Sequence, residues 1–345
     1  MGRLEKLSRI RFNSVRISTM HPISFQKARL AALALSLVSV AGPAHSEGIL
    51  GKTTVAYRTV NGHDILVDVH RPKGADVRPV IVWFHGGALI MGNREAIIPQ
   101  IVTLAEEKGY ALVSFDYRLA PETKLPAISS DIEAAFAWLG SDGAKRFHLD
   151  TKRMIVAGNS AGGYLTLTTG YRVKPKPRAL VALYGYGRLN AAWYSQPNLF
   201  PEYNKTKITR EEASAQSDGG VISDSSKRKG DADTIYRYYR QNGLWPQEVS
   251  GFPSSSIAEL IAQYEPAKNV TREYPPTLLM HGTDDHDVPY EESANMALQF
   301  EKHGVPYVLK TIDRGGHGFG GGSPDQIEDA YRSMRDFIVR YLDGE

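Results

Sequence analysis

Short runs of consecutive apolar residues recur along most of this chain, separated by segments whose apolar residues have helical spacing. The apolar runs are Val80–Phe84, Ala111–Phe115, Met154–Ala157, Ala179–Leu183, Thr277–Met280 and Val308–Ile312. The segments with helical spacing include Ile128–Leu139, Ser293–His303 and Gln326–Leu342. Buried parallel strands are apolar along their whole length, and helices usually connect them. The alternation therefore predicts an α/β fold with a mostly parallel sheet and helices on both faces.

A β-hairpin is expected before the first buried strand. Thr53–Val60 and Ile65–His70 alternate apolar and polar residues, and they flank the dipeptide Asn61-Gly62. Asn-Gly favours the tight turns that join antiparallel strands, so these two segments are predicted to pair.

One long region interrupts the alternation. Residues 187–272 contain no clear strand but many aromatic side chains: Trp193, Tyr194, Phe200, Tyr203, Tyr236, Tyr238, Tyr239, Trp245, Phe252 and Tyr264. Its middle, Lys205–Asp231, is polar and is predicted to be a solvated loop, with the basic triplet Lys227–Lys229 as a hypothetical surface for nucleic acid. Long insertions in compact domains are usually functional, so we expect a cap or lid at about 187–272; a satellite packing cluster is the alternative.

The first 46 residues differ in composition from the rest. Seven Lys and Arg and a single Glu accompany the apolar run Leu30–Ala41, and small residues follow it in Gly42–Ser46. This order predicts a secretory signal peptide at 1–46, since a run of twelve residues is too short to span a bilayer comfortably. The alternatives are an uncleaved anchor and a start at Met20 instead of Met1. We therefore expect a periplasmic or secreted catalytic domain at 47–345, without stable membrane insertion.

The net charge of the chain is dominated by this leader. The whole sequence has 41 Lys and Arg against 38 Asp and Glu, but residues 47–345 have 34 against 37, a net charge of −3. The basic balance therefore gives no reason to expect a nucleic-acid partner. The chain has no cysteine, which excludes a thiol nucleophile and a cysteine zinc site and leaves stability to the core.

The first candidate for chemistry follows the run Met154–Ala157, because ligands bind beyond the carboxyl ends of parallel strands. The sequence there is GNSAGG (Gly158–Gly163), which places Gly-x-Ser-x-Gly between a strand and a helix-compatible segment. On such a turn Ser160 would expose its hydroxyl near a helix N-terminus, where developing negative charge is favoured. We predict that Ser160 is a nucleophile; a glycine-rich turn with an incidental serine is the alternative.

Two further loops follow strands of the same predicted sheet. The sequence HGGALIMG (His85–Gly92) has a glycine pair directly after a strand, which would let backbone N–H groups face a cavity and stabilise an oxyanion. A phosphate-binding loop is the alternative, but no Lys-Ser/Thr follows at the required spacing. The sequence DRGGHGFGGG (Asp313–Gly322) carries His317 in a glycine-rich loop, which favours a catalytic base over a buried structural histidine.

The loop after Thr277–Met280 has two histidines and three aspartates between His281 and Asp287. A catalytic serine needs a base, and the base needs a carboxylate that fixes its tautomer. Asp285 lies in His-Gly-x-x-Asp-x-x-Val-Pro, 32 residues before His317, and is predicted to be that carboxylate. Asp284 and Asp287 remain rivals, with surface or loop-capping roles as their alternatives. A metal site using His281 with Asp285, or Asp284 with Asp287, is another alternative, but no metal-binding partner segment is found, so no metal or cofactor is expected.

Together these motifs resemble the α/β-hydrolase superfamily. HGGA (85–88), DYRLAPE (116–122) and GNSAGG resemble the hormone-sensitive-lipase-type carboxylesterases, whereas HGTDDHDVP and GGHGF resemble the acid and histidine loops of prolyl-oligopeptidase-type hydrolases. The resemblance covers roughly residues 65–186 and 273–342. It implies an α/β-hydrolase fold: a mostly parallel sheet of the eight-stranded type with helices on both faces and an inserted cap.

The resemblance also implies roles for individual residues. The implied catalytic residues are Ser160 as nucleophile, His317 as base and Asp285 as acid. The implied oxyanion hole consists of the backbone N–H groups of Gly87, Ala88 and Ala161. Ala88 replaces a third glycine found in many of these lipases, which implies a narrower pocket. Arg118 and Glu122 are expected to brace the loop His85–Ala88.

The expected function is that of a serine carboxylesterase acting on short-chain or aromatic esters through an acyl-enzyme. A small-molecule ester is then the partner, and the sequence does not indicate the oligomeric state. Hydrolysis of amides, lactams or peptides is the first alternative, suggested by the acid loop. A non-catalytic ligand-binding protein on a hydrolase scaffold is the second, although the complete set Ser160, Asp285 and His317 argues against it.

Overall fold

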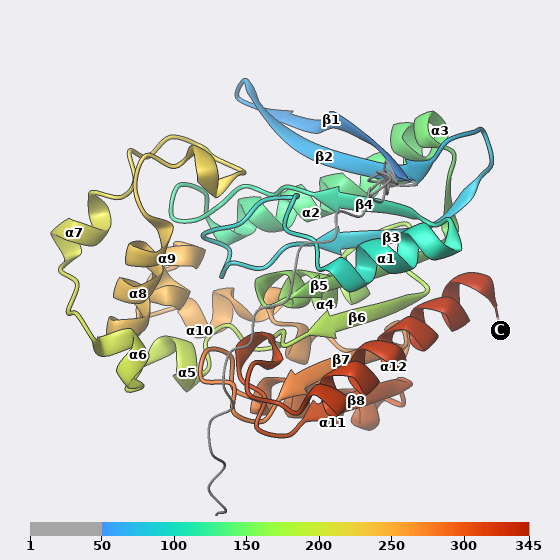
Figure 1. The fold of residues 1–345 in the computed structure, drawn as a ribbon. Coiled ribbons are helices and arrows are strands. Elements are labelled where there is room, and N and C mark those ends of the chain that lie inside the picture. Colours follow the sequence, from blue (N-terminus) through green and yellow to red (C-terminus); the bar gives the residue numbers. More distant parts are fainter. Residues whose placement is uncertain (1–49, 345) are drawn as a thin grey trace, which may run out of the picture. The chain divides into compact units, whose positions relative to one another are not determined.

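An eight-stranded sheet forms the centre of the fold in the computed structural model, which describes residues 50–344; the predicted signal peptide lies outside these residues (Figure 1). The strand order is β1-β2-β4-β3-β5-β6-β7-β8. Only β1, β2 and β4 pair in antiparallel fashion, and all other neighbours are parallel. The strands are β1 Leu50–Val60, β2 His63–Pro72, β3 Arg78–Phe84, β4 Ala111–Phe115, β5 Leu149–Asn159, β6 Ala179–Leu183, β7 Thr277–Gly282 and β8 Tyr307–Ile312. The predicted fold class is confirmed.

The predicted hairpin is β1–β2. Val60 pairs with His63 across the turn, and both turn residues have positive φ, 50° at Asn61 and 80° at Gly62. Those angles are the ones that Asn-Gly turns adopt most readily, so the local sequence alone accounts for this connection.

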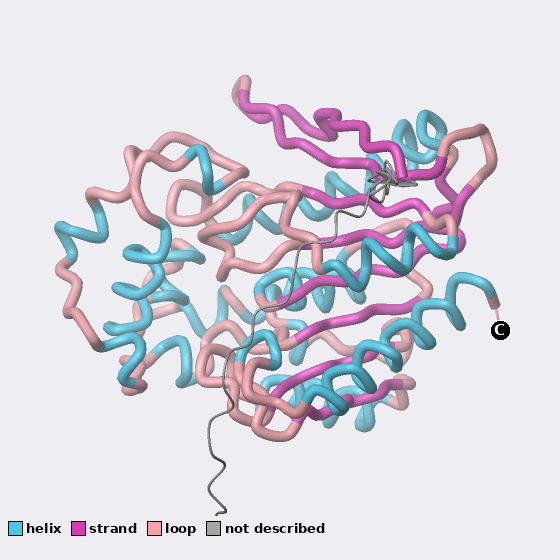
Figure 2. Tube along the Cα trace, in the orientation of Figure 1, coloured by secondary structure: helices cyan, strands magenta, loops and turns pink. Residues whose placement is uncertain are grey.

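Helices cover both faces of the sheet (Figures 1 and 2). Successive residues of β3 point to opposite faces, so Val80, Val82 and Phe84 join one apolar cluster, while Ile81 and Trp83 join the other. The helices α2 (Leu125–Trp138), α4 (Ala161–Arg172) and α11 (Glu291–His303) pack on the first face. The helices α1 (Pro99–Lys108) and α12 (Pro324–Asp343) pack on the second.

Residues 187–272 contain no strand, as predicted, and the structure shows short helices joined by loops there. The helices are α5 Ala192–Ser195, α6 Pro201–Asn204, α7 Arg210–Ser214, α8 Ala232–Asn242, α9 Trp245–Ser250 and α10 Ile257–Leu260. In Figure 1, α6 to α9 gather beyond one end of the strands, at the left of the view. Buried aromatic rings join this region to the main core, for example Trp245, which packs in a T-shaped arrangement with Tyr186, outside the region, at a centroid distance of 6.2 Å. Within the part of the chain that the structure describes, no helix is long and apolar enough to cross a membrane.

Candidate active site

Ser160 lies on the sharp turn between β5 and α4. Its backbone has φ 53° and ψ −120°, an unusual conformation for a residue with a side chain, and its N–H donates to the Leu183 carbonyl oxygen. A Cβ atom at Gly162 would overlap the carbonyl oxygen of Phe84 at the end of β3, so the close approach of the two segments requires glycine there. The turn therefore presents the Ser160 hydroxyl at the carboxyl end of the sheet, as the motif predicted.

The structure brings the three predicted catalytic side chains together from three different loops. The Nε2 atom of His317 lies 3.0 Å from Ser160 Oγ, and its Nδ1 atom lies 2.8 Å from Asp285 Oδ2. The Oδ1 atom of Asp285 accepts the backbone N–H groups of Asp287 and Val288, which fix the carboxylate in this orientation. With Nδ1–H donating to Asp285, Nε2 is free to accept the serine proton.

Electrostatics in this site favour a charged Asp285 and a basic His317. Burial opposes ionisation of Asp285, but hydrogen bonds from His281 and His317 hold its pKa well below the usual value. Partial burial would lower the pKa of His317, but the hydrogen bond to Asp285 and the charges of Asp287 and Asp285 raise it above the usual value. The edge of the Tyr184 ring also packs on the imidazole, at a centroid distance of 4.7 Å.

The other polar residues around Asp285, in the segment 281–288 here called the acid loop, have different environments. Asp284 is exposed, whereas Asp287 is partly buried and its Oδ2 atom lies 3.6 Å from His317 Nε2. His281 is buried, and its nitrogens contact Ser293 Oγ at 2.7 Å and the Val288 carbonyl oxygen at 2.9 Å. Both nitrogens of His281 are thus occupied by protein groups, which leaves none for the alternative metal site.

Three internal hydrogen bonds shape the loop after β3, which carries the predicted oxyanion donors. His85 is buried, and burial lowers its pKa to about 4, so its neutral ring can donate Nδ1–H to the Gly86 carbonyl oxygen at 2.7 Å. The Gly87 carbonyl oxygen accepts the N–H groups of Ile90 and Met91. In a planar peptide the N–H points away from the C=O, so these bonds turn the N–H groups of Gly87 and Ala88 outward from the loop.

The third predicted donor is the N–H of Ala161. Ala161 is the first residue of α4, directly after Ser160, and the first N–H groups of a helix have no partner within the helix. Its position therefore suits an oxyanion hole.

Residues 187–272, here called the insertion, also form hydrogen bonds with the loop after β3. Trp245 Nε1 donates to the Ala88 carbonyl oxygen at 3.0 Å, and Arg228 Nη1 donates to the Ile90 carbonyl oxygen at 2.6 Å. Ser225 bonds both the N–H and the carbonyl of Gly92. The insertion thus contacts three residues of this loop through side chains that lie more than 130 positions later in the sequence.

Arg228 corrects the prediction of a wholly solvated basic loop. Lys227 and Lys229 are exposed, but Arg228 is buried and forms an ion pair with Glu122 in which both side chains are at most 2% exposed. A guanidinium has enough donors to bind Glu122 and two backbone carbonyl oxygens at once, which compensates for its burial.

Of the two residues expected to brace the His85–Ala88 loop, only Glu122 does so, through Arg228. Arg118 pairs instead with the buried Asp131, with Nε 2.8 Å from Oδ2, and Asp131 also binds Arg58 of β1. Asp131 thus links α2 to Arg118, after β4, and to Arg58 of the hairpin.

A cavity of about 830 Å³ opens next to Ser160 and His317. The loop after β3 lines it with Gly86, Gly87, Ala88 and Met91. The insertion lines it with Glu202, Tyr203, Ser225, Asp233, Tyr236 and Arg237, and the acid loop adds Asp287. The volume is in the range of small-molecule sites, so the predicted catalytic residues adjoin a space that a ligand can enter.

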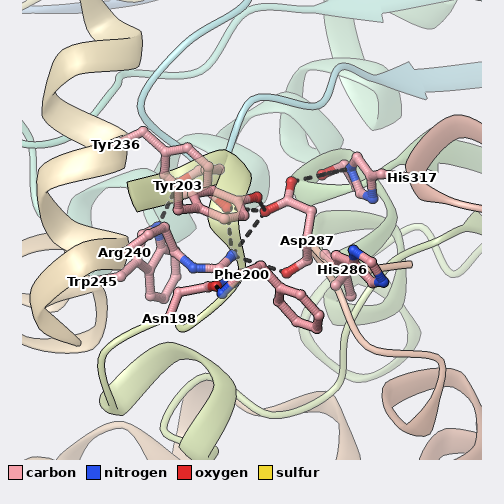
Figure 3. A network of polar contacts seen from close by, with 12 residues as sticks. Asn198, Phe200, Tyr203, Tyr236, Arg240, Trp245, His286, Asp287 and His317 are labelled. Carbon is pink, nitrogen blue, oxygen red and sulfur yellow. Dashed lines mark hydrogen bonds and ion pairs between the residues drawn. The ribbon is translucent and has the colours of Figure 1, made fainter. Parts of the chain in front are cut away.

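Asp287 connects the insertion to the histidine (Figure 3). Its Oδ1 atom accepts hydrogen bonds from the hydroxyls of Tyr203 and Tyr236 and from Arg240 Nη1, the last at 2.8 Å. Arg240 is buried, and its guanidinium lies over four aromatic rings of the insertion, those of Trp193, Tyr194, Tyr203 and Tyr236. No motif in the sequence points to Arg240 or distinguishes Asp287 from its rival Asp285; the aromatic residues near Arg240 in the sequence are the one signal of this cluster.

Comparison with known proteins gives a family match over the whole site. A family model described as alpha/beta hydrolase fold matches residues 81–320, which is more than half of the chain. Among curated proteins, the non-reducing polyketide synthase Preu3 of Preussia isomera is 24% identical over 378 residues, covering 95% of this chain and 15% of that protein. The chain thus spans only a small part of that relative's length.

Solved structures show the same fold at low sequence identity. A protein with unknown function from Staphylococcus aureus subsp. aureus Mu50 has a TM-score of 0.66 and 22% identity, over 84% of this chain and 99% of that chain. Esterase LipW from Mycobacterium marinum has a TM-score of 0.59 and 21% identity, over 85% and 82%. Carboxyl esterase 2 from Tuber melanosporum has a TM-score of 0.60 and 19% identity, over 87% and 89%.

Proposed function

The chain belongs to the alpha/beta hydrolase family, and from this premise we propose that it is a serine carboxylesterase acting on short-chain or aromatic carboxylic esters. The observation that carries the proposal is the hydrogen-bonded series Ser160–His317–Asp285, with separations of 3.0 and 2.8 Å, beside a cavity. The esterases among the solved structures of the same fold are consistent with it.

In the first half-reaction, His317 Nε2 takes the proton of Ser160 Oγ as this oxygen bonds to the ester carbonyl carbon. The carbonyl oxygen becomes an anion and accepts hydrogen bonds from the N–H groups of Gly87, Ala88 and Ala161. Asp285 stabilises the imidazolium through Nδ1–H. The carbon–oxygen bond to the alcohol then breaks, the leaving oxygen takes the proton from Nε2, and an acyl-serine remains.

In the second half-reaction, water replaces the alcohol. His317 removes a proton from the water as its oxygen attacks the acyl carbon, and the proton is then returned to Ser160 Oγ. The products are a carboxylic acid and an alcohol, and the enzyme is restored.

The proposal predicts that Ser160→Ala loses at least about 10⁴-fold in kcat on a p-nitrophenyl ester while the protein stays folded. A fluorophosphonate probe should label wild-type protein at Ser160 and leave the variant unlabelled. Circular dichroism and Tm provide the control for folding.

A matched ester and anilide with the same acyl group distinguish esterase from amidase activity, and the ester should be cleaved much faster. Full ester turnover by the folded Ser160→Ala variant would refute the mechanism. Faster cleavage of the anilide would replace the esterase proposal with that of an amidase.

A further inference from the structure

Asp287 presents one carboxylate oxygen to the insertion and the other to the reaction centre (Figure 3). Oδ1 is held by Tyr203, Tyr236 and Arg240. Oδ2 lies 3.6 Å from His317 Nε2, beyond hydrogen-bond length, and the side chain is 22% exposed on the cavity wall. A carboxylate oxygen in a partly buried site forms strong hydrogen bonds when a donor is supplied, so Oδ2 is a ready acceptor for a ligand.

The position of Oδ2 specifies which part of an ester it would meet. In the proposed reaction, His317 Nε2 donates the proton it took from Ser160 to the leaving oxygen of the alcohol. That oxygen must therefore come within hydrogen-bond distance of Nε2. A hydroxyl on the carbon adjacent to the one that bears the leaving oxygen lies about one hydrogen-bond length from that oxygen. Because Oδ2 is only 3.6 Å from Nε2, such a hydroxyl can donate to Oδ2 while the leaving oxygen contacts Nε2.

The remaining lining of the cavity agrees with a polar alcohol group. The insertion supplies hydroxyl, carboxylate and guanidinium groups from Tyr236, Asp233 and Arg237, whereas the loop after β3 supplies mainly glycine, alanine and methionine. Two carboxylates of this wall already have guanidinium partners, Asp287 with Arg240 at 2.8 Å and Asp233 with Arg237 at 3.9 Å, so they give a cationic alcohol group little uncompensated negative charge. A neutral group that donates hydrogen bonds suits both features.

We propose that Asp287 selects esters of polyhydroxy alcohols, by accepting a hydrogen bond from a hydroxyl on the carbon adjacent to the one that bears the ester oxygen. This inference rests on the proposed esterase function and specifies its substrate class. The ester is hydrolysed at its carbon–oxygen bond to the alcohol, as described above, and the neighbouring hydroxyl keeps its proton throughout.

Three acetate esters test the proposal by their kcat/KM values: 2-hydroxyethyl, 2-methoxyethyl and n-propyl acetate. The first two leaving groups have similar inductive effects, but only the first can donate a hydrogen bond. We expect wild-type enzyme to prefer 2-hydroxyethyl acetate over 2-methoxyethyl acetate by about tenfold. Acetylcholine, which is cationic and has no donor, should gain no such advantage.

Two variants assign the preference to Asp287. In Asp287→Ala and Asp287→Asn any change in the basicity of His317 affects all the esters alike, so the ratio of kcat/KM values isolates the substrate contact. We expect the hydroxyethyl preference to fall to about twofold or less in Asp287→Ala and to be reduced in Asp287→Asn. Asp284→Asn removes the same charge from an exposed position of the same loop and should keep the wild-type ratio.

The outcomes separate this inference from the proposed function. No hydrolysis of any ester by wild-type enzyme would refute the esterase function itself. Hydrolysis of all the esters without a hydroxyethyl preference, a preference that survives in Asp287→Ala, or a preference for acetylcholine would each overturn the inference about the alcohol and leave the esterase function intact.

Discussion

Two carboxylates contact the imidazole of His317, each at a different nitrogen. Asp285 binds Nδ1 at 2.8 Å, and Asp287 lies 3.6 Å from Nε2, the nitrogen that faces Ser160. Both negative charges favour the imidazolium, so both strengthen His317 as a base. Arg240 partly balances the charge of Asp287, so Asp287 stabilises the imidazolium of His317 less than an unpaired carboxylate would.

This arrangement predicts the acid limb of the pH profile. His317 must be neutral to accept the serine proton, so kcat/KM falls as the pH falls through the pKa of His317. That pKa is raised, so the limb lies above the ordinary histidine value of about 6.5. In Asp287→Asn one of the negative charges that raise this pKa is lost, so we expect the limb to move to lower pH.

The measurement uses n-propyl acetate, whose alcohol group cannot donate a hydrogen bond to residue 287. Asp284→Asn serves as the charge-matched control. An unchanged limb in Asp287→Asn would show that the charge of Asp287 does not reach the imidazole.

The loop after β3 is held in a conformation that its own residues disfavour. Ala88 and Leu89 have φ values of 55° and 62°, in the left-handed region that costs energy for residues other than glycine. Trp245 and Arg228 bind carbonyl oxygens on either side of Leu89. The insertion therefore compensates for backbone strain in the segment that carries the proposed oxyanion donors.

Arg228→Met is expected to lower kcat by about 10–100-fold with little change in KM, since the loop would no longer hold its donors in place. The affinity for a trifluoromethyl ketone, which forms a tetrahedral adduct with serine, should fall in parallel. Loss of the buried ion pair should also cost about 3–5 kcal/mol of stability, because Glu122 would stay buried without a counter-ion.

The exposed Lys229→Met is the control and should leave both kcat and Tm unchanged. Removing both charges, in Arg228→Met with Glu122→Gln, should recover part of the stability but not the kcat. Recovery of kcat in the double variant would assign Arg228 to stability alone.

The insertion and the sheet share one core and one set of buried ion pairs. The large apolar cluster includes Trp245 and Tyr194 of the insertion together with Phe84 of β3 and Phe115 of β4. The pairs Arg228–Glu122 and Arg240–Asp287 cross between the insertion and the loops at the carboxyl end of the sheet. Opening the insertion as a rigid lid would separate these charges.

We therefore expect residues 187–272 to unfold together with the sheet. Tryptophan fluorescence reports on both parts, because Trp193 and Trp245 lie in the insertion while Trp83 and Trp138 lie in the sheet and α2. Fluorescence, far-UV circular dichroism and loss of activity should follow a single urea transition. An early fluorescence change before loss of secondary structure would indicate that the insertion opens independently.

The local sequence predicted the elements and the positions of three catalytic candidates. The spacing of apolar residues distinguishes strands from helices. A parallel sheet then places the residues that follow each strand at the same edge. This is why Ser160, Asp285 and His317 could be selected although they lie up to 157 positions apart. The signal peptide at 1–46 and the role of 187–272 as a lid stay predictions.

The contacts of Asp287, Arg228 and Arg240 are visible only in the tertiary structure. In the sequence, an arginine between lysines in a polar stretch has the pattern of a solvated loop, and Asp287 has no signal that distinguishes its role from that of the nearby candidate Asp285. Their burial depends on partners supplied by distant segments: Arg228 meets the Ile90 carbonyl oxygen 138 positions away, and Arg240 meets Asp287 47 positions away. A charged side chain is stable inside a protein only where such partners converge, and that convergence is a property of the packed chain, which no local pattern encodes.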